Sequence, residues 1–110
     1  MPNLKIFVDQ SGLADVQPAL AALLPDLRAR LCEALGVGIS ASQVAVLPVL
    51  GMPDQPSINV ELTLLSGPSR SREALVELAQ EVQARMDAAT GAHAAVRIAT
   101  VDPSGYVACK

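Results

Sequence analysis

The stretch P-N-L-K-I-F-V, residues 2–8, has the pattern that decides the fold, and P-S-I-N-V repeats it at residues 56–60. The two stretches lie 54 residues apart, counted from Pro2 to Pro56. Apolar side chains alternate with other side chains along both, and a period of two is the signature of a β-strand. In the first stretch the alternating apolar residues are Leu4, Ile6 and Val8. The sequence therefore predicts two related strands, one opening each half of the chain.

A helix is predicted after the first strand. Apolar residues recur at helical spacing over residues 19–35, and Gly36 follows as a stop signal. Pro25 lies inside this stretch. Proline removes a backbone hydrogen bond from a helix at a cost of about 3 kcal/mol. We therefore expect either a kink at Pro25 or a helix that begins there.

The second half of the chain repeats this order of elements. An apolar stripe from Leu75 to Met86 predicts a helix that ends near Gly91, with Ser69 or Ser71 as its N-cap. Three further alternating segments predict strands at residues 43–49, 57–65 and 96–101. A duplicated β-α-β unit explains this order, with units at about 2–50 and 56–110 forming one domain.

The predicted fold class is α+β, with a four-stranded sheet covered by two helices on one face. A right-handed crossover joins the two parallel strands of each unit, which places both helices on the same side of the sheet. The other face then carries apolar residues with nothing to cover them, among them Phe7, Ala45, Leu47 and Ala99. Burial between copies of the chain would cover them, so we expect self-association.

Composition excludes several classes of partner. The 110 residues carry a formal net charge of -3 and contain no basic run, which argues against nucleic acid binding. The apolar stretches are too short to cross a membrane, and no secretion signal precedes the first strand. The sequence therefore predicts a cytoplasmic protein. Two cysteines and one histidine provide too few ligands for a structural metal site, and no cofactor is expected.

The chain resembles the tautomerase superfamily. It begins Met-Pro, enters a strand at once and repeats a β-α-β unit, and the resemblance spans essentially the whole chain. In layout it is most similar to 5-carboxymethyl-2-hydroxymuconate isomerase and to the macrophage migration inhibitory factor family, which share the plan of two fused units. The resemblance implies keto-enol isomerisation of small carboxylic acids and assembly into a homotrimer.

The resemblance assigns roles to individual residues. Pro2 falls on the catalytic proline of the superfamily. The segment S-G-P-S-R-S-R-E, residues 66–73, resembles the G-R-S segment of 4-oxalocrotonate tautomerase and places Arg70 on its substrate-carboxylate arginine. The segment A-V-R-I likewise places Arg97 on the second arginine. Tyr106 falls near the aromatic residue that walls the pocket, and Lys5 is a further candidate for substrate binding.

The chain departs from the family pattern in its first unit. That unit lacks both arginines, and Ala45 is taken as the residue equivalent to Arg97. An arginine that follows the first helix in the muconate isomerase is replaced here by Ser40-Ala41-Ser42. Arg97 has a second interpretation, an ion pair at an interface. The departures leave the identity of the substrate open.

The chemistry implied for Pro2 requires removal of Met1, because only a terminal proline is a secondary amine. Desolvation and nearby cations disfavour the ammonium form of such an amine, and so make it a usable general base near neutral pH. It would move a proton between the oxygen and carbon ends of an enol or 2-hydroxy-dienoate, with arginines holding the carboxylate. The alternative is a non-enzymatic oligomeric module that binds a small acid, since fold alone does not establish catalysis.

Overall fold

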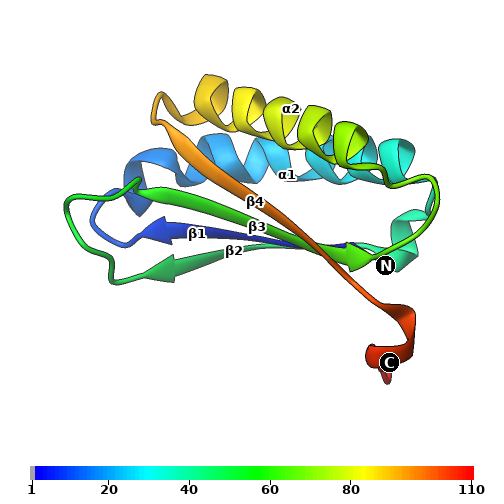
Figure 1. Ribbon diagram of the computed structural model, residues 1–110. Helices are drawn as coiled ribbons and strands as arrows, with labels where there is room; N and C mark the ends of the chain where they lie inside the picture. Colours follow the sequence, from blue (N-terminus) through cyan, green and yellow to red (C-terminus); the bar gives the residue numbers. More distant parts are fainter. Residues whose placement is uncertain (1) are drawn as a thin grey trace.

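A mixed sheet of four strands forms one layer of the computed structural model, which describes residues 2–110 (Figure 1). The strands are β1 (Asn3–Asp9), β2 (Gln43–Val49), β3 (Ile58–Leu65) and β4 (Ala94–Val101). They lie in the order β2-β1-β3-β4. The central strands β1 and β3 are antiparallel, whereas β2 is parallel to β1 and β4 is parallel to β3. All four strands occur where the sequence predicts them, with ends that differ by at most two residues.

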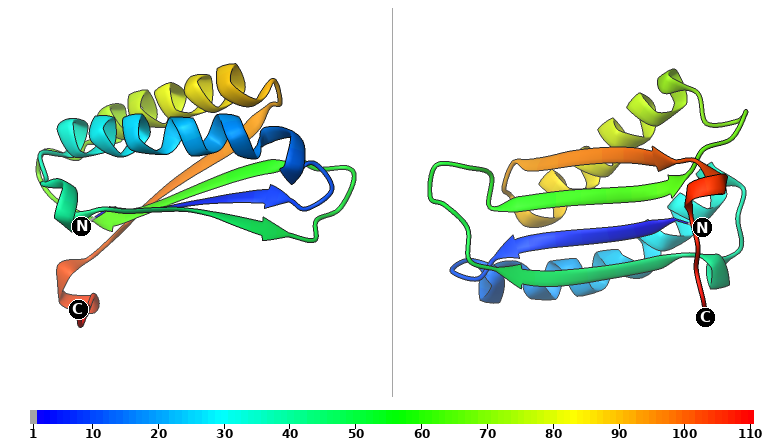
Figure 2. Two further views of the ribbon diagram at one scale, coloured as in Figure 1. Left: turned by 180° about the vertical axis from the view of Figure 1, so that it is seen from behind. Right: turned by 60° about the horizontal axis from the view of Figure 1, so that its bottom comes forward.

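Two helices form the second layer. Helices α1 (Leu13–Leu35) and α2 (Arg72–Thr90) contact each other and cover the same face of the sheet (Figure 2). Short 3-10 helices, η1 (Ile39–Ala41) and η2 (Pro103–Gly105), precede β2 and follow β4. The predicted α+β arrangement of two β-α-β units with both helices on one face is confirmed.

The core lies between the helices and the inner face of the sheet. Alternate residues of the central strands are almost fully buried there, as their period of two requires. Their partners are the apolar stripes of the two helices. The buried set consists of Leu4, Ile6 and Val8 from β1, Ile58, Val60, Leu62 and Leu64 from β3, Leu20, Leu27 and Leu31 from α1, and Leu78, Val82 and Met86 from α2.

Helix α1 differs from the prediction at its start. It begins at Leu13, before the predicted start at Ala19, and it continues through both Pro18 and Pro25. The two prolines are seven residues apart, which is about two turns, so they share one side of the helix, and both are exposed. Water can therefore reach the carbonyl groups that each proline leaves without a helical donor. The helix keeps its buried stripe despite the lost bonds.

The ends of the helices follow the sequence signals. Gly36 and Gly91 adopt left-handed backbone conformations after α1 and α2, with φ angles of 66° and 72°. Glycine adopts this conformation without the steric cost that a Cβ imposes. Of the two candidate N-caps of α2, Ser71 fills the role, since its hydroxyl accepts a hydrogen bond from the Ala74 amide at 3.2 Å.

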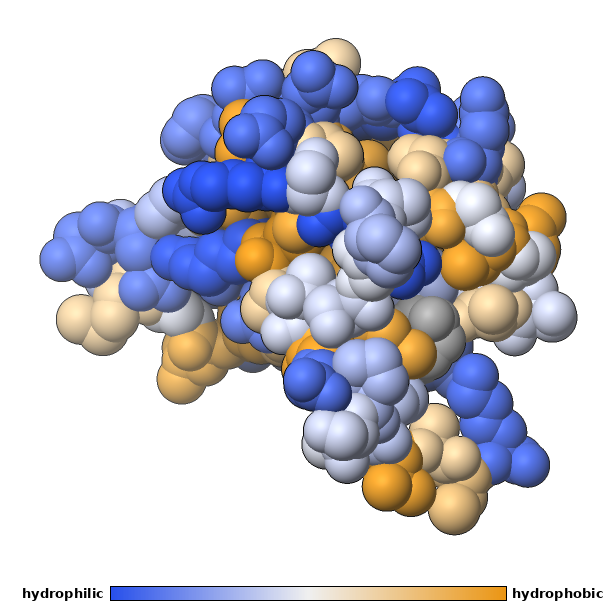
Figure 3. All heavy atoms as spheres, turned by 45° about the vertical axis from the view of Figure 1, so that its right-hand side comes forward, coloured by the Kyte–Doolittle hydropathy of each residue, from blue (hydrophilic) through white to orange (hydrophobic). Residues whose placement is uncertain are grey.

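The outer face of the sheet carries the uncovered apolar side chains that the sequence predicts. Phe7 and Leu47 are half-buried, and Ala45 and Ala99 are exposed. After β4, the chain leaves the sheet toward this outer side (Figures 1 and 2). The C-terminal segment projects from the body of the molecule, and its Val107 is 87% exposed (Figure 3). The outer face of the sheet and the projecting segment therefore both expose apolar side chains.

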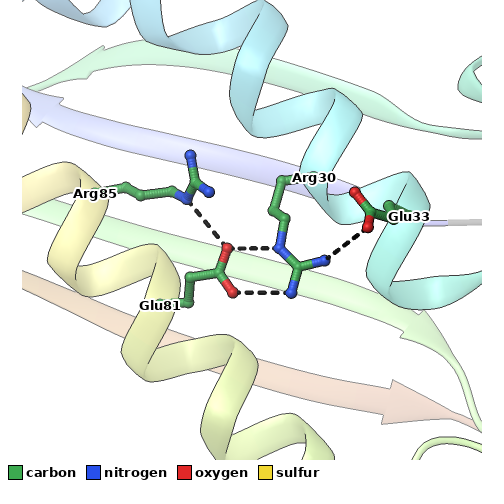
Figure 4. A network of polar contacts seen from close by, with 4 residues as sticks. All are labelled: Arg30, Glu33, Glu81 and Arg85. Atoms are coloured by element: carbon green, nitrogen blue, oxygen red, sulfur yellow. Dashed lines mark hydrogen bonds and ion pairs between the residues drawn. The ribbon is translucent and has the colours of Figure 1, made fainter.

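An ion-pair network joins the two helices (Figure 4). Glu81 of α2 accepts two hydrogen bonds from Arg30 of α1, from Nε at 2.7 Å and from Nη2 at 3.1 Å. Arg85 donates to the same carboxylate at 3.1 Å, and Glu33 lies 3.9 Å from Arg30. The hydrogen bonds from Arg30, more than those from Arg85, lower the pKa of the Glu81 carboxyl. Bidentate arginine–carboxylate pairs of this kind also fix relative orientation.

The sequence also made predictions about membrane-spanning segments and about the cysteines. Within residues 2–110, no helix is long and apolar enough to cross a membrane. Both cysteines are free thiols, with Cys32 buried and Cys109 exposed.

We expect Glu81→Gln to lower the melting temperature by about 2 °C at neutral pH, because it removes the carboxylate on which both arginines converge. The folded pKa of Glu81 is lowered, so its stabilisation is present above the unfolded carboxyl pKa of about 4.3 and is lost as the pH falls through the folded value. Thermal melts of both proteins between pH 7 and pH 2, at about 1-unit steps, would therefore converge in acid. Glu77→Gln is the matched control, since Glu77 makes no ion pair within residues 2–110. A difference in melting temperature between the wild type and Glu81→Gln that does not change with pH would contradict the role given to the Glu81 carboxylate.

Candidate functional site

Pro2 is fixed at the start of the central strand β1. It is buried, and its carbonyl accepts a hydrogen bond of 3.0 Å from the backbone N–H of Gln43 in β2. The next residue, Asn3, pairs with Thr63 of β3, so Pro2 lies beside the last residues of β3. Removal of Met1 concerns a residue outside the described range 2–110. The strand pairings on both sides hold Pro2 at one defined end of the sheet.

Arg70 occupies that same end of the sheet. Its Nη1 donates to the carbonyl of Leu65, the last residue of β3, at 3.0 Å. Its Nη2 donates to the carbonyl of Leu35, the last residue of α1, at 3.4 Å. The Arg70 side chain thus joins the end of β3 to the C-terminus of α1, where a cation is favourable. The structure brings Arg70 and Pro2 to one end of the molecule.

Arg70 keeps some hydrogen-bonding capacity. A guanidinium has five N–H donors, and the two carbonyl contacts use two of them. Its Nε is buried without a hydrogen-bond partner within residues 2–110. A buried donor with no acceptor is costly, so the arrangement favours an acceptor at this position.

Lys5 and Arg97 lie on the outer face of the sheet, and both are exposed. Strand register places Lys5 beside Glu61 and Glu61 beside Arg97, so the three form one row across β1, β3 and β4. Lys5 and Arg97 are therefore separated by two strand spacings, or about 10 Å. Arg97 donates to the side-chain oxygen of Asn59, away from the end of the sheet that holds Pro2. Within one chain, Arg97 and Pro2 are not brought together.

Register also corrects one comparison between the two units. Aligning Pro2 with Pro56 makes Phe7 equivalent to Glu61. Phe7 pairs with Leu47, and Glu61 pairs with Arg97, so the counterpart of Arg97 is Leu47 and not Ala45. The prediction from Ala45 was wrong because the connection between helix and strand differs in length between the units.

Tyr106 follows η2 and is half-buried. The turn before it is ordered by Asp102, whose carboxylate accepts hydrogen bonds of 2.8 Å from both the backbone N–H and the hydroxyl of Ser104. The backbone bond is the main reason why the pKa of Asp102 is lowered. Strand β4 ends at Val101 beside Leu65, so Tyr106 leaves the sheet at the end that holds Pro2 (Figure 2).

Sequence reasoning missed a hollow of about 590 Å³ between α2 and β4. Its walls come from the outward side of α2 and the helix-facing side of the edge strand, where α2 leaves β4 only partly covered. The lining residues are Ser66, Arg70, Arg72, Leu75, Val76, Ala79, Val96, Ile98 and Thr100. The only sequence signal for it is the small side chain of Ala79 opposite Val96 and Ile98, and this is too weak to predict a cavity.

Residues 2–110 hold no group of three or more His, Cys, Asp or Glu side chains arranged to bind a metal ion. No protein-family model matches the sequence, and no curated protein matches it significantly.

Solved structures, in contrast, share the fold. A fused 4-OT solved as an asymmetric trimer matches with a TM-score of 0.77 and 14% identity, over 96% of this chain and 91% of the other. Macrophage migration inhibitory factor from Toxoplasma gondii matches with a TM-score of 0.71 and 17% identity, over 96% and 95%. N1, a member of the cis-3-chloroacrylic acid dehalogenase family, matches with a TM-score of 0.73 and 14% identity, over 96% and 79%. The chain therefore shares the fold of these three proteins, and the predicted resemblance is confirmed at the level of fold.

Proposed function

We propose that this protein is a tautomerase that uses the amine of Pro2, freed by removal of Met1, as a general base on an enol or 2-hydroxy-dienoate carboxylic acid. The observation that carries the proposal is the placement of Pro2 at the start of β1, at the same end of a tautomerase-type sheet as Arg70. The fold alone permits other activities, so the proposal rests on this pair.

The proposed reaction is a proton transfer with no net change in atoms. The neutral Pro2 nitrogen takes the proton of the enol hydroxyl, the C–O bond gains double-bond character, and the proton returns to carbon at the other end of the conjugated system. Burial and a nearby guanidinium both disfavour an ammonium ion and lower the pKa of an amine. A base with a pKa near neutral is the most effective in such transfers. The buried position of Pro2, with Arg70 at the same end of the sheet, supports this role.

Arg70 is the proposed ligand for the substrate carboxylate. Its two carbonyl contacts hold the guanidinium in place before substrate arrives, which reduces the ordering required on binding. The N–H donors of the two terminal nitrogens that the carbonyl contacts leave unused can bind carboxylate oxygens. Tyr106 is proposed as a wall of the same site, because the chain leaves β4 at this end of the sheet.

Lys5 and Arg97 are proposed to bind the substrate on which the Pro2 of another copy acts. Both lie on the outer face, whereas Pro2 lies at the end of the sheet and is buried. A homotrimer in which the outer faces are covered would bury the apolar residues of that face. The fused 4-OT neighbour is a trimer, which supports this assembly. A cytoplasmic location remains a prediction from the sequence.

The first test of this proposal is the assembly itself. We expect a homotrimer by size-exclusion chromatography with light scattering at micromolar concentration, because the outer face exposes apolar surface. Leu47→Lys and Phe7→Glu should weaken the assembly, since each places a charge on that face. A stable monomer of the wild-type chain would contradict both the burial argument and the proposed assembly.

The arginines are tested by steady-state kinetics. We expect Arg70→Ala to raise the apparent KM for a carboxylate substrate by about tenfold, and more than Arg72→Ala does, because charge-assisted hydrogen bonds to a carboxylate contribute most to its binding. Arg70→Lys keeps the charge but not the planar fork, and should give an intermediate KM. Thermal melts of all three variants separate loss of binding from loss of folding. Equal and negligible effects at both positions would show that Arg70 does not hold the carboxylate.

The base is tested through the terminal amine. We expect intact mass to show loss of Met1, and the processed protein to ketonise phenylenolpyruvate or 2-hydroxymuconate. Pro2→Ala leaves a primary amine in nearly the same place, and should lower kcat by about 10²-fold without loss of the trimer. A form that retains Met1 has an amide at this nitrogen and should lose the proline-dependent rate. If that form turns over as fast as the processed one, the non-enzymatic acid-binding module is the better account.

A further inference from the structure

The hollow between α2 and β4 is separate from Pro2. Its inner boundary is formed by Val96, Ile98 and Thr100 of β4, and Pro2 is not among its lining residues. Thr100 pairs with Leu64 of β3, beside which Pro2 lies, so a whole strand stands between Pro2 and the hollow. Its volume of about 590 Å³ is within the range of small-molecule sites, about 300–1,000 Å³.

The hollow has mixed walls, in which aliphatic side chains lie beside polar groups. Five of the nine lining residues are aliphatic, namely Leu75, Val76, Ala79, Val96 and Ile98. Val76 is 43% exposed although it is a large apolar residue. Apolar surface is also visible between polar residues on this side of the molecule (Figure 3). A ligand with an alkyl or aryl chain would cover this surface and gain by its burial.

The remaining lining residues set the charge of the hollow. They are two arginines and two hydroxyl residues, Ser66 and Thr100, and no lining residue is acidic. The terminal nitrogens of Arg70 already donate to backbone carbonyls. Arg72 is exposed and makes no hydrogen bond or ion pair within residues 2–110. Arg72 is therefore the lining cation whose whole guanidinium is unpaired within the described residues, whereas Arg70 keeps only part of its donors.

We propose that this hollow binds an amphipathic monocarboxylate, with the carboxylate on Arg72 and the apolar chain along Val76, Ala79 and Ile98. The combination of an unpaired guanidinium with aliphatic wall residues favours a ligand that has an anionic head and an apolar tail. Arg70 lines this hollow and is also the proposed ligand for the substrate carboxylate, so the two sites are neighbours, but binding on Arg72 does not depend on the reaction at Pro2.

The proposal is tested by ligand titration followed by ¹⁵N–¹H NMR. Octanoate is compared with octylammonium, which has the same chain and the opposite charge, and with acetate, which has the charge without the chain. We expect octanoate to bind with a Kd below about 1 mM, and both controls to bind at least about tenfold more weakly. The amide shifts should map to the lining residues of β4 and α2, and decanoate should bind several-fold more tightly than octanoate.

Two variants separate the contributions of charge and space. Arg72→Glu reverses the charge and should fold normally, because an acidic residue is favourable in the first turn of a helix. Arg72→Glu should weaken the binding of octanoate by at least about tenfold and strengthen the binding of octylammonium. Arg28→Glu, which changes an exposed arginine of α1, should change neither affinity. Ala79→Leu fills the hollow and should weaken both ligands.

Several results would overturn the proposal. They are equal affinities of the wild-type chain for octanoate and octylammonium, unchanged octanoate binding in Arg72→Glu, or amide shifts outside the hollow. Pro2→Ala should bind octanoate with wild-type affinity, and Arg70→Ala should weaken octanoate binding less than Arg72→Glu does. A larger loss in Arg70→Ala, or a loss in Pro2→Ala, would show that the ligand occupies the proposed substrate site and not the site on Arg72.

Discussion

The antiparallel pairing of β1 with β3 is the constraint on which the rest of the structure depends. Each strand carries its buried apolar residues on one face, and the register aligns Leu4 with Leu62 and Ile6 with Val60. A shift of one residue would turn every core side chain to the other face. The same register places Pro2 beside the end of β3, where Arg70 contacts the Leu65 carbonyl. Core and candidate site are therefore fixed by one set of strand contacts.

The two units have similar backbones but have diverged in their side chains. Arg30 and Arg85 fall at equivalent positions, and both pair with Glu81 of the second unit. The residue equivalent to Glu81 is Asp26, which makes no ion pair within residues 2–110. One carboxylate thus serves both halves, and this fixes the helices relative to each other. The second unit also supplies Arg70 and the walls of the hollow.

The sequence predicted those parts of the molecule that depend on local pattern. The strands follow from alternation, and the helix ends follow from Gly36, Gly91 and Ser71. The early start of α1 was missed because the apolar stripe was taken to begin at Ala19, and Pro25 reads locally as a breaker. Tertiary burial of the leucine stripe outweighs the cost of the two prolines inside the helix. Pro2 and Arg70 came from family resemblance. The carbonyl contacts of Arg70 and the hollow beside α2 depend on packing between distant segments, which no local pattern encodes.

The alternation of side chains along β1 has a further consequence for how a site can be assembled. Lys5 lies on the outer face and Leu4 on the inner face, so the sheet separates the groups on its two sides. Arg97 lies on the outer face and two strand spacings from β1, so Arg97 and the buried Pro2 of one chain are not positioned to meet one small substrate. If both residues serve one reaction, the working unit contains more than one chain. Specific activity then falls on dilution below the dissociation range of the assembly, although each individual chain stays folded.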